Sequence, residues 1–428
     1  MKVAFYALGC KVNQYEIDCC ARIFRDKGWE IGSFDEPCDV YIVNTCSVTN
    51  LSDRKSRQIL RRAKKLNPSS KVGAMGCYVQ TKPEEIKAMP EVDFFAGNSH
   101  RSLIYDLAIK ALEEEKSGEV CDISHEKTYE ELQCEGALER TRAYIKIEDG
   151  CDNFCSYCII PYARGPVRSR KLENIVAEAK RLSDNGFCEL VLTGISVSSY
   201  GKDLKDGTSL IDVIEAVSKI AAVKRIRISS IDPRAFTDDF IQRLSNISKL
   251  CRHFHISLQS GSASVLKRMN RKYTPKEYLD TLKRIREKMP ESAITTDIIC
   301  GFPGETETEF KETLDFVKKA EFSKVHIFPY SERSKTVAAK MEQLPMKVRE
   351  ERCKILSEAE KPLSESFMKG MIGKTESVLF EKTENGFSEG FTGNYLRVYV
   401  KTEHPLDNSV HPVIITDYTD GKLFARLK

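Results

Sequence analysis

Between residues 141 and 330, short apolar runs alternate with helix-like stretches, and this pattern leaves few folds open to the chain. Helix-like stretches such as LENIVAEAKRLSDNG and TPKEYLDTLKRIREKM separate the runs. Strands separated by helices pair in parallel, so the pattern predicts a full or partial parallel barrel with an active site at the carboxyl ends of its strands. The six runs expected to form strands are AYIKIEDG, CELVLTGIS, RIRISSI, HFHISLQS, AITTDIIC and KVHIFPY.

The two ends of the chain carry different patterns. Near the N-terminus, the runs KVAFYAL, DVYIVNT and KVGAMG are separated by helix-like stretches, which predicts an open parallel α/β domain. From about residue 370, the runs TESVLFEK, LRVYVKT, PVIITDY and KLFARLK alternate like antiparallel strands and predict a small β-barrel.

We therefore predict an α/β protein in four parts. They are an N-terminal open parallel α/β domain over residues 1–112, an acidic linker over 113–138, a partial parallel (β/α)6 barrel over 139–366, and a small antiparallel β-barrel over 367–428. The linker is predicted because residues 111–140 hold ten acidic and three basic residues, which is typical of a solvated segment.

Composition indicates a cytosolic protein. The chain has 428 residues, of which 41% are apolar and 30% charged, as expected of two or three globular domains. No apolar run approaches the ~20 residues of a membrane span, and the start MKVAFYALGCKVNQYE lacks a signal-peptide cleavage region. Fifteen cysteines in a reducing compartment favour metal or redox chemistry over disulfides.

A compact cysteine array follows the first strand of the predicted barrel. Cys151, Cys155 and Cys158 form C-x3-C-x2-C in GCDNFCSYC. A zinc site needs a fourth Cys or His, and none occurs in the twenty residues after Cys158, although Cys134 upstream remains available. Three thiolates on a 4Fe–4S cluster leave one iron without a protein ligand, and an open coordination position is typical of a catalytic metal centre.

A second set of three cysteines is dispersed along the N-terminal domain. Cys10, Cys46 and Cys77 each follow one of the three predicted strands. Because ligands collect outside the carboxyl ends of parallel strands, we expect these cysteines to converge on one edge of the sheet.

These motifs resemble the radical S-adenosylmethionine (SAM) methylthiotransferase family over essentially the whole chain. That family combines a three-cysteine N-terminal domain, a radical SAM core and a C-terminal β-barrel called TRAM. The matching segments are LGCKVNQYE, IVNTCSVT, GCYVQ, GCDNFCSYCIIPYARG, SLQSGSASVLKRMNR, GFPGETE and HIFPYSER.

Within the family, GCKVN and FPYSER resemble most closely the enzymes that act on N6-threonylcarbamoyladenosine (t6A) in tRNA. Relatives acting on isopentenyladenosine more often read GCQMN, and a third branch modifies an aspartate of a ribosomal protein. Ser257 departs from the family pattern, which usually has proline there, and we expect this to change local stiffness rather than chemistry.

The resemblance implies two 4Fe–4S clusters and SAM as cofactors. The Cys151, Cys155 and Cys158 cluster would chelate SAM and cleave it reductively to a 5′-deoxyadenosyl radical. The Cys10, Cys46 and Cys77 cluster would carry the sulfur that is inserted, and a second SAM would methylate it. No side chain is expected to act as an acid or base. The implied partners are tRNA, an electron donor such as flavodoxin or ferredoxin, and a sulfur source, with no membrane.

Binding residues are expected at strand ends and in basic segments. The alternative for each strand-end residue is a turn or cap, and for the basic helix a solvated face. Expected SAM contacts are Thr193, Gly194, Ser229, Ser230, Gln259, Ser260, Pro329 and Tyr330. Expected tRNA phosphate contacts are Arg54, Lys55, Arg57, Arg61 and Arg62, with Arg164, Arg168 and Arg170 beside the radical cluster.

Two rival hypotheses remain open at the level of sequence. The same chemistry could act on isopentenyladenosine in tRNA or on a ribosomal-protein aspartate. Alternatively, the chain could be a metal-stabilised RNA-binding protein without radical chemistry. Under any of these hypotheses, a C-terminal barrel that binds RNA, as TRAM domains do, is expected to use local patches and aromatic residues such as Phe391, Tyr395 and Tyr399; the alternative is that these residues form the barrel core.

Overall fold

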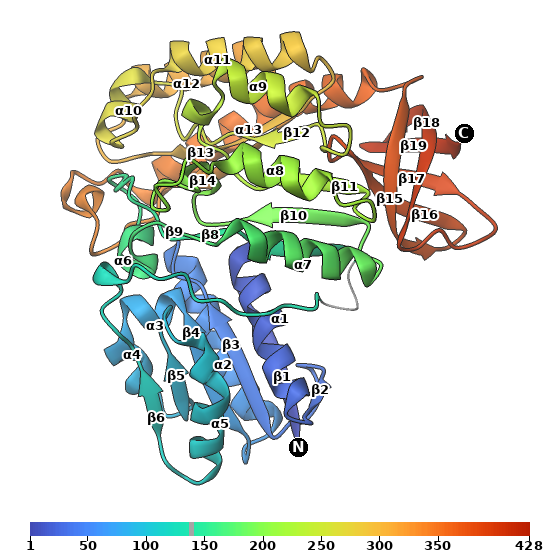
Figure 1. Ribbon diagram of the computed structural model, residues 1–428. Helices are drawn as coiled ribbons and strands as arrows, with labels where there is room; N and C mark the ends of the chain where they lie inside the picture. Colours follow the sequence, from blue (N-terminus) through green and yellow to red (C-terminus); the bar gives the residue numbers. More distant parts are fainter. Residues whose placement is uncertain (137–140) are drawn as a thin grey trace.

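The structure is a computed structural model that describes residues 1–136 and 141–428. Figure 1 shows three units: an N-terminal sheet with its helices in blue to cyan, a central barrel in green to orange, and a red C-terminal barrel beside the core. These units confirm the predicted fold class. The predicted boundary between residues 138 and 139 lies outside the described residues.

The N-terminal sheet has six parallel strands in the order β2-β1-β3-β4-β5-β6. The three predicted strands are neighbours at its centre, as β1, β3 and β4. The last strand lies within the predicted acidic linker, so the linker prediction was wrong for these residues. Their backbone pairs with β5 and forms the edge of the sheet. The strands are β1 Lys2–Ala7, β2 Glu30–Gly32, β3 Val40–Thr45, β4 Lys71–Gly76, β5 Phe94–Ala96 and β6 Ser117–Glu119.

Helices cover both faces of this sheet. Phe24 of α1 and Ala108 of α5 pack in one apolar core, whereas Leu60 of α2 and Ile86 of α4 pack in the other. The helices are α1 Lys11–Asp26, α2 Asn50–Leu66, α3 Cys77–Thr81, α4 Pro83–Lys87 and α5 Ile104–Leu112, with the 3-10 turns η1 Arg101–Leu103 and η2 Ile123–His125. Helices α1 and α3 begin shortly after a strand ends, which places Cys10 and Cys77 at their N-termini.

The core contains two three-stranded parallel sheets, β7-β10-β11 and β12-β13-β14. Single bridges from Ile226 to Leu250 and from Ile231 to Ile256 join them, so the six strands form the predicted partial barrel. The strands are β7 Arg142–Lys146, β10 Glu189–Thr193, β11 Arg225–Ile228, β12 His253–His255, β13 Ala293–Cys300 and β14 Lys324–Pro329, with a short ribbon of β8 Glu148–Asp149 and β9 Arg168–Ser169.

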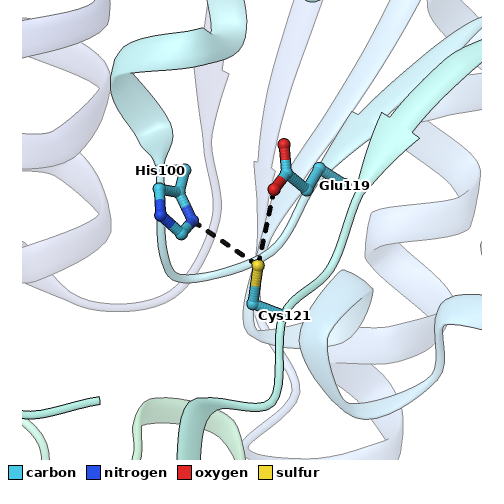
Figure 2. A group of neighbouring side chains, drawn as sticks. All are labelled: His100, Glu119 and Cys121. Atoms are coloured by element: carbon cyan, nitrogen blue, oxygen red, sulfur yellow. Dashed lines mark hydrogen bonds between the residues drawn. The ribbon is translucent and has the colours of Figure 1, made fainter.

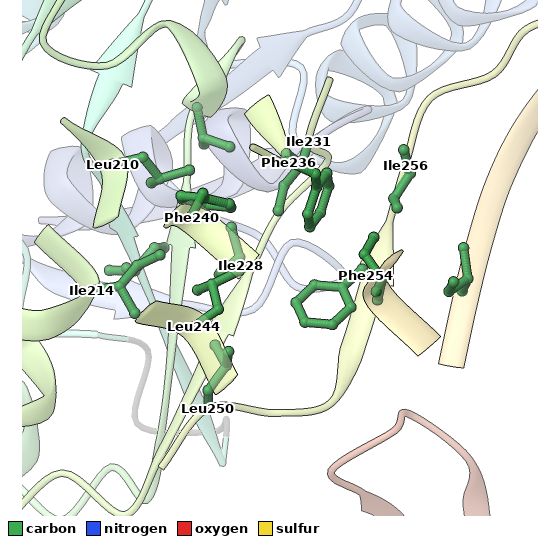
Figure 3. Packing of buried hydrophobic residues seen from close by; sticks show 14 of the residues in the cluster. Leu210, Ile214, Ile228, Ile231, Phe236, Phe240, Leu244, Leu250, Phe254 and Ile256 are labelled. Atoms are coloured by element: carbon green, nitrogen blue, oxygen red, sulfur yellow. The ribbon is translucent and has the colours of Figure 1, made fainter. Parts of the chain in front are cut away.

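Helices on the outside of the barrel bury one face of each strand. Figure 3 shows Ile228 of β11 and Phe254 of β12 in one apolar cluster with Ile214 of α8 and Phe240 of α9. Side chains alternate along a strand, so Leu190 and Leu192 enter this outer core while Glu189 and Thr193 face the barrel interior. The helices are α6 Ile160–Arg164, α7 Leu172–Asp184, α8 Leu210–Ser218, α9 Asp238–Ser245, α10 Ala263–Arg268, α11 Pro275–Lys288, α12 Glu307–Ala320 and α13 Met346–Lys369, with 3-10 turns η3 Val197–Ser199, η4 Pro233–Ala235 and η5 Val337–Lys340.

The C-terminal barrel is closed in the order β15-β16-β17-β19-β18. Two details differ from the prediction. Strand β16 lies between the predicted strands TESVLFEK and LRVYVKT, where no strand was predicted, and the pair β17 with β19 is parallel. The strands are β15 Thr375–Glu384, β16 Phe387–Thr392, β17 Arg397–Lys401, β18 Ser409–Thr419 and β19 Lys422–Leu427. Across the described ranges, no helix combines the length and apolar character needed to span a membrane.

Candidate functional site

The Cys151–Cys158 loop follows β8 at the carboxyl end of the first barrel strand, as predicted. Gly150 permits this turn, because its φ is 89° and a Cβ there would lie 1.9 Å from the Pro166 carbonyl oxygen. Ser156 Oγ donates to the Arg268 carbonyl at 2.7 Å, and Arg271 donates to Cys155 Sγ at 3.4 Å. The loop is therefore held by the end of α10 and the segment that follows it.

A cavity of about 410 Å³ opens above this loop and is lined by all three thiols. Four of the residues predicted to contact SAM line it: Ser230, Gln259, Pro329 and Tyr330. Sequence reasoning missed Asn153, Asp232, Ser257, Arg271 and Asp297, which also line it. Asp232 follows a predicted strand end and Arg271 lies in a matched motif, so both carried a usable signal.

The remaining predicted SAM residues lie elsewhere. Thr193, Gly194 and Ser229 line a second, adjoining cavity. Ser260 is fully buried, where its hydroxyl is 3.2 Å from Thr313 Oγ1, and it lines neither cavity. For Ser260 the cap interpretation fits the structure better, because its hydroxyl also accepts a hydrogen bond from the Ser262 amide at 3.2 Å.

The second set of cysteines converges at the carboxyl edge of the N-terminal sheet. Cys10 precedes α1, Cys46 follows β3 and Cys77 begins α3. A Cβ on Gly9, whose φ is 92°, would lie 2.6 Å from Cys46 Sγ, so the first two loops are in close contact. Cys10 lines the second cavity described below. Desolvation by the surrounding protein raises the pKa of its thiol to about 12. The positive charge of Arg164 lowers this pKa, and Cys77 raises it further.

Arg164 joins this second set to the radical SAM core. Its Nε donates to Cys77 Sγ at 3.2 Å, and its other nitrogens bind Glu16 at 2.5 Å and Asn13 Oδ1 at 2.6 Å. Arg164 also lies 3.3 Å from Asp149 of β8. Burial raises the pKa of Glu16, but Arg101 and Arg164 outweigh it and bring that pKa to about 2. The charged network thus fixes the two units against each other.

The donor sets fit iron–sulfur clusters better than single ions. Tetrahedral zinc places its sulfur ligands roughly 3.8 Å apart, given Zn–S bonds of about 2.3 Å. Among the described residues, neither cysteine set has its sulfurs grouped within 4.8 Å. Cys134, the available fourth zinc ligand, is buried beside Cys19 in a separate cluster with Tyr15. Each site therefore offers three spaced thiols.

One tight group of metal-ligand type does occur, at the end of the N-terminal sheet. Figure 2 shows His100 and Glu119 pointing toward Cys121, whose Sγ lies 3.6 Å from His100 Nδ1 and 3.5 Å from Glu119 Oε1. His100 and Glu119 are exposed, and the three residues line neither cavity. Nothing in the sequence pattern predicted this group.

The predicted tRNA contacts divide into two classes. Arg164, Arg168 and Arg170 are at most 3% exposed and already paired with carboxylates, so their placement does not support phosphate binding. The basic helix α2 is more open. Its Arg54, Lys55, Arg61 and Arg62 are exposed and Arg57 is half-buried against Tyr78; Arg61 and Arg62 pair with Glu91 and Asp35.

The second cavity, of about 720 Å³, lies between Cys10, the barrel interior and the C-terminal barrel. It shares five lining residues with the first cavity, Val48, Ile160, Ile195, Ser230 and Asp297, so the two cavities adjoin. Within the described chain, Ser229 Oγ and His253 Nδ1 are buried at this cavity without a hydrogen-bond partner. Such orphaned polar atoms fit a polar ligand.

Two family models match this chain, one in the barrel and one in the N-terminal domain. The Radical SAM superfamily model matches residues 145–317, and Uncharacterized protein family UPF0004 matches residues 2–97. Among solved structures, the radical SAM methyltransferase TsrM from Kitasatospora setae shares the fold with a TM-score of 0.57 at 15% identity, covering 79% of this chain and 77% of that one. The fold and the Cys151–Cys158 site define a radical SAM enzyme, which implies a 4Fe–4S cluster and SAM.

Sequence relatives identify the family. Threonylcarbamoyladenosine tRNA methylthiotransferase MtaB of Bacillus subtilis is 42% identical over 93% of this chain and 90% of the relative. The protein of the same name from Thermotoga maritima is 38% identical over 94% and 91%. The tRNA-2-methylthio-N(6)-dimethylallyladenosine synthase of Acetivibrio thermocellus is 35% identical over 90% and 82%. The chain belongs to the radical SAM methylthiotransferase family, which confirms the resemblance seen in its motifs.

Proposed function

We propose that the protein methylthiolates N6-threonylcarbamoyladenosine next to the anticodon of tRNA, by radical C–H activation, sulfur insertion and S-methylation. One observation carries this proposal: the cavity above Cys151, Cys155 and Cys158 adjoins a larger cavity that reaches Cys10. A substrate base placed where the two cavities meet would lie between Cys10 and the core cysteine set. The two relatives above that are named for t6A are 42% and 38% identical to this chain, against 35% for the one named for dimethylallyladenosine.

Each cysteine set holds one 4Fe–4S cluster in this proposal, Cys151, Cys155 and Cys158 in the core and Cys10, Cys46 and Cys77 in the N-terminal domain. When bound, the first supplies the electron that cleaves SAM to a 5′-deoxyadenosyl radical, and the second supplies the sulfur. The chain's own residues bind and orient the reactants. Gln259, Asp232 and Arg271 give the SAM cavity its polar contacts.

The junction between the cavities has the character that a radical step needs. Val48, Ile160 and Ile195 line both cavities and place apolar side chains where the SAM site meets the substrate site. Apolar walls exclude water and the side reactions it brings. Ser230 and Asp297 are the polar residues common to both linings, so they are positioned to contact either reactant.

The tRNA would contact α2, where Arg54 and Lys55 are exposed and, in the described residues, carry no carboxylate partner. The helix begins at Asn50, shortly after Cys46, so its basic face lies near the second set of thiols. The proposal also requires an electron donor such as flavodoxin or ferredoxin, a sulfur source, and a location in the cytosol with the tRNA.

Two measurements test the proposal. Anaerobic reconstitution is expected to load about eight irons per chain, from two clusters of four. Expression in a strain that lacks methylthiolated t6A is expected to restore that nucleoside, as measured by mass spectrometry of digested tRNA. Methylthiolation of isopentenyladenosine or of a ribosomal-protein aspartate instead would replace the proposed substrate. A protein that binds zinc alone and forms no 5′-deoxyadenosine would overturn the chemistry.

A further inference from the structure

A cluster of arginines behind the lining of the second cavity carries more positive charge than its ion pairs balance. Arg142, Arg225 and Arg227 all pair with one carboxylate, Glu189, at 3.1, 2.7 and 2.7 Å. Arg225 and Arg227 are buried, Arg142 is partly buried, and Glu189 is fully inaccessible. Lys11 lines the cavity within electrostatic reach of this cluster: Arg227 and Arg142 act on it as like charges, whereas Glu189 and Cys10 oppose them.

Further pairing does not neutralise this group. Arg142 also pairs with Glu381 at 2.9 Å, so among the described residues the three arginines share two carboxylates in ion pairs. The arginines are committed to structure as well, because Arg225 donates to the Phe391 and Thr392 carbonyl oxygens of the C-terminal barrel. Throughout the described chain, Lys11 has no ion pair or side-chain hydrogen bond. Lys11 is therefore an unpaired cation in the lining of the second cavity, which is called the chamber below.

Other ionic groups on the cavity wall are already matched. Lys324 pairs with Glu360 at 3.2 Å, and Arg397 lies 3.4 Å from Glu389. Asp297 is the acidic residue of the lining, and its Oδ2 lies 3.1 Å from His255 Nε2. The unmatched positive charge is therefore concentrated at Lys11, beside Cys10.

We infer that this chamber binds the N6 substituent of the substrate base, and that Lys11 recognises its carboxylate. The inference rests on the proposed function and names what selects its substrate. A threonylcarbamoyl group carries a carboxylate, whereas an isopentenyl group is apolar and would leave Lys11 unpaired. The volume of about 720 Å³ falls within the range of about 300–1,000 Å³ that ligand sites occupy.

Two orphaned polar atoms suit the rest of the substituent. Ser229 Oγ and His253 Nδ1 face the chamber and are available to its amide and hydroxyl groups. The His253 ring stacks on the Tyr395 ring, with 5.0 Å between their centroids, and the Arg227 guanidinium lies 4.4 Å from the Tyr395 centroid. This stack, which includes Tyr395 of the C-terminal barrel, forms a fixed wall, so the chamber has a defined shape for a polar group.

The first test changes the substrate and leaves the protein intact. Reconstituted wild-type enzyme is titrated with anticodon stem-loop RNAs carrying t6A, its carboxamide analogue, or isopentenyladenosine, and binding is followed by fluorescence anisotropy. We expect the carboxamide to bind about 10- to 100-fold more weakly than t6A, the range for losing a hydrogen bond to a charged group. Equal affinity for acid and amide would overturn the inference.

The second test changes the protein. Lys11→Gln is expected to abolish the difference between acid and carboxamide, Lys11→Arg to retain it, and Lys110→Gln, on the exposed face of α5, to behave like wild type. Iron content is measured for each, because Lys11 neighbours Cys10. A Lys11→Gln enzyme with full iron that still prefers the acid would overturn the inference. If wild type instead prefers isopentenyladenosine, the proposed function fails as well.

Discussion

Each cysteine set presents three thiols, but the two sets are assembled from different parts of the fold. Cys151, Cys155 and Cys158 lie in one loop, which is held by hydrogen bonds with residues 268–271. Cys10, Cys46 and Cys77 come from three strand ends, and their geometry depends on the whole sheet and on Arg164 of the core. The local set is visible as a motif, whereas the dispersed set exists only after folding. The dispersed set should therefore be the more sensitive to distant changes.

Removing the local set should have the largest effect. Changing Cys151, Cys155 and Cys158 together to alanine is expected to abolish SAM cleavage and all methylthiolation, since no other group in the described site can start the reaction. Iron should fall to about half, from eight to about four per chain. The readouts are iron content and 5′-deoxyadenosine after reduction with dithionite. Residual deoxyadenosine above a no-enzyme blank would contradict this assignment.

Removing the dispersed set should separate two activities. The Cys10, Cys46 and Cys77 triple alanine variant is expected to lose about half of its iron and all methylthio product, yet keep SAM cleavage. Both effects follow if the sulfur comes from this set alone. Chromatography of the SAM products and mass spectrometry of the tRNA check them. A folded variant that no longer cleaves SAM would show that the sets do not divide the work.

The link between the two regions can be broken without touching a cysteine. Arg164→Leu removes the buried partner of Glu16 and Asp149 and is expected to destabilise the protein by about 3 kcal/mol. Iron should be lost from the dispersed set first. The matched control is Arg61→Leu, whose exposed pair with Glu91 should be worth less than about 1 kcal/mol. Denaturant unfolding compares them, and equal effects would argue against the interdomain role of Arg164.

The smallest effect is expected at the surface beside the dispersed set. The double variant Arg54→Gln, Lys55→Gln should weaken tRNA binding several-fold. The loss of about two phosphate contacts should reduce the slope of log K against log salt concentration by about two. Iron content and SAM cleavage should not change. Binding measured at a series of salt concentrations gives the slope. An unchanged slope would show that Arg54 and Lys55 do not contact tRNA phosphates.

The sequence anticipated much of this architecture, and its failures have physical causes. Strand and helix periods indicated all three units, and the cysteine after each of β1, β3 and β4 indicated where they meet. Charge was misleading at Arg164, because its neutralising partner Glu16 lies 148 residues away and only the fold unites them. At Arg170 the partners are nearer in sequence, Glu178 at 8 residues and Glu131 at 39, but both pairs still form only in the fold.

Strand β16 was missed for a different reason. Its sequence FSEGFT holds Ser388 and Thr392, which resemble turn residues, yet both are buried in the closed barrel. Thr392 is satisfied there by hydrogen bonds with the Leu396 backbone, and its carbonyl accepts from Arg225 and Arg227. A polar strand of this kind is fixed by partners that periodicity does not reveal.

The central claim is that the two sets act on one substrate through adjoining cavities, and isotope transfer tests it most directly. The Cys10, Cys46 and Cys77 triple alanine variant is incubated with SAM, a reductant and t6A-containing RNA deuterated on the adenine ring. The account predicts deuterium in the 5′-deoxyadenosine and no methylthio product, because the radical still reaches the base but finds no sulfur. Deoxyadenosine without deuterium, from an enzyme that retains its core cluster and binds the RNA, would contradict it.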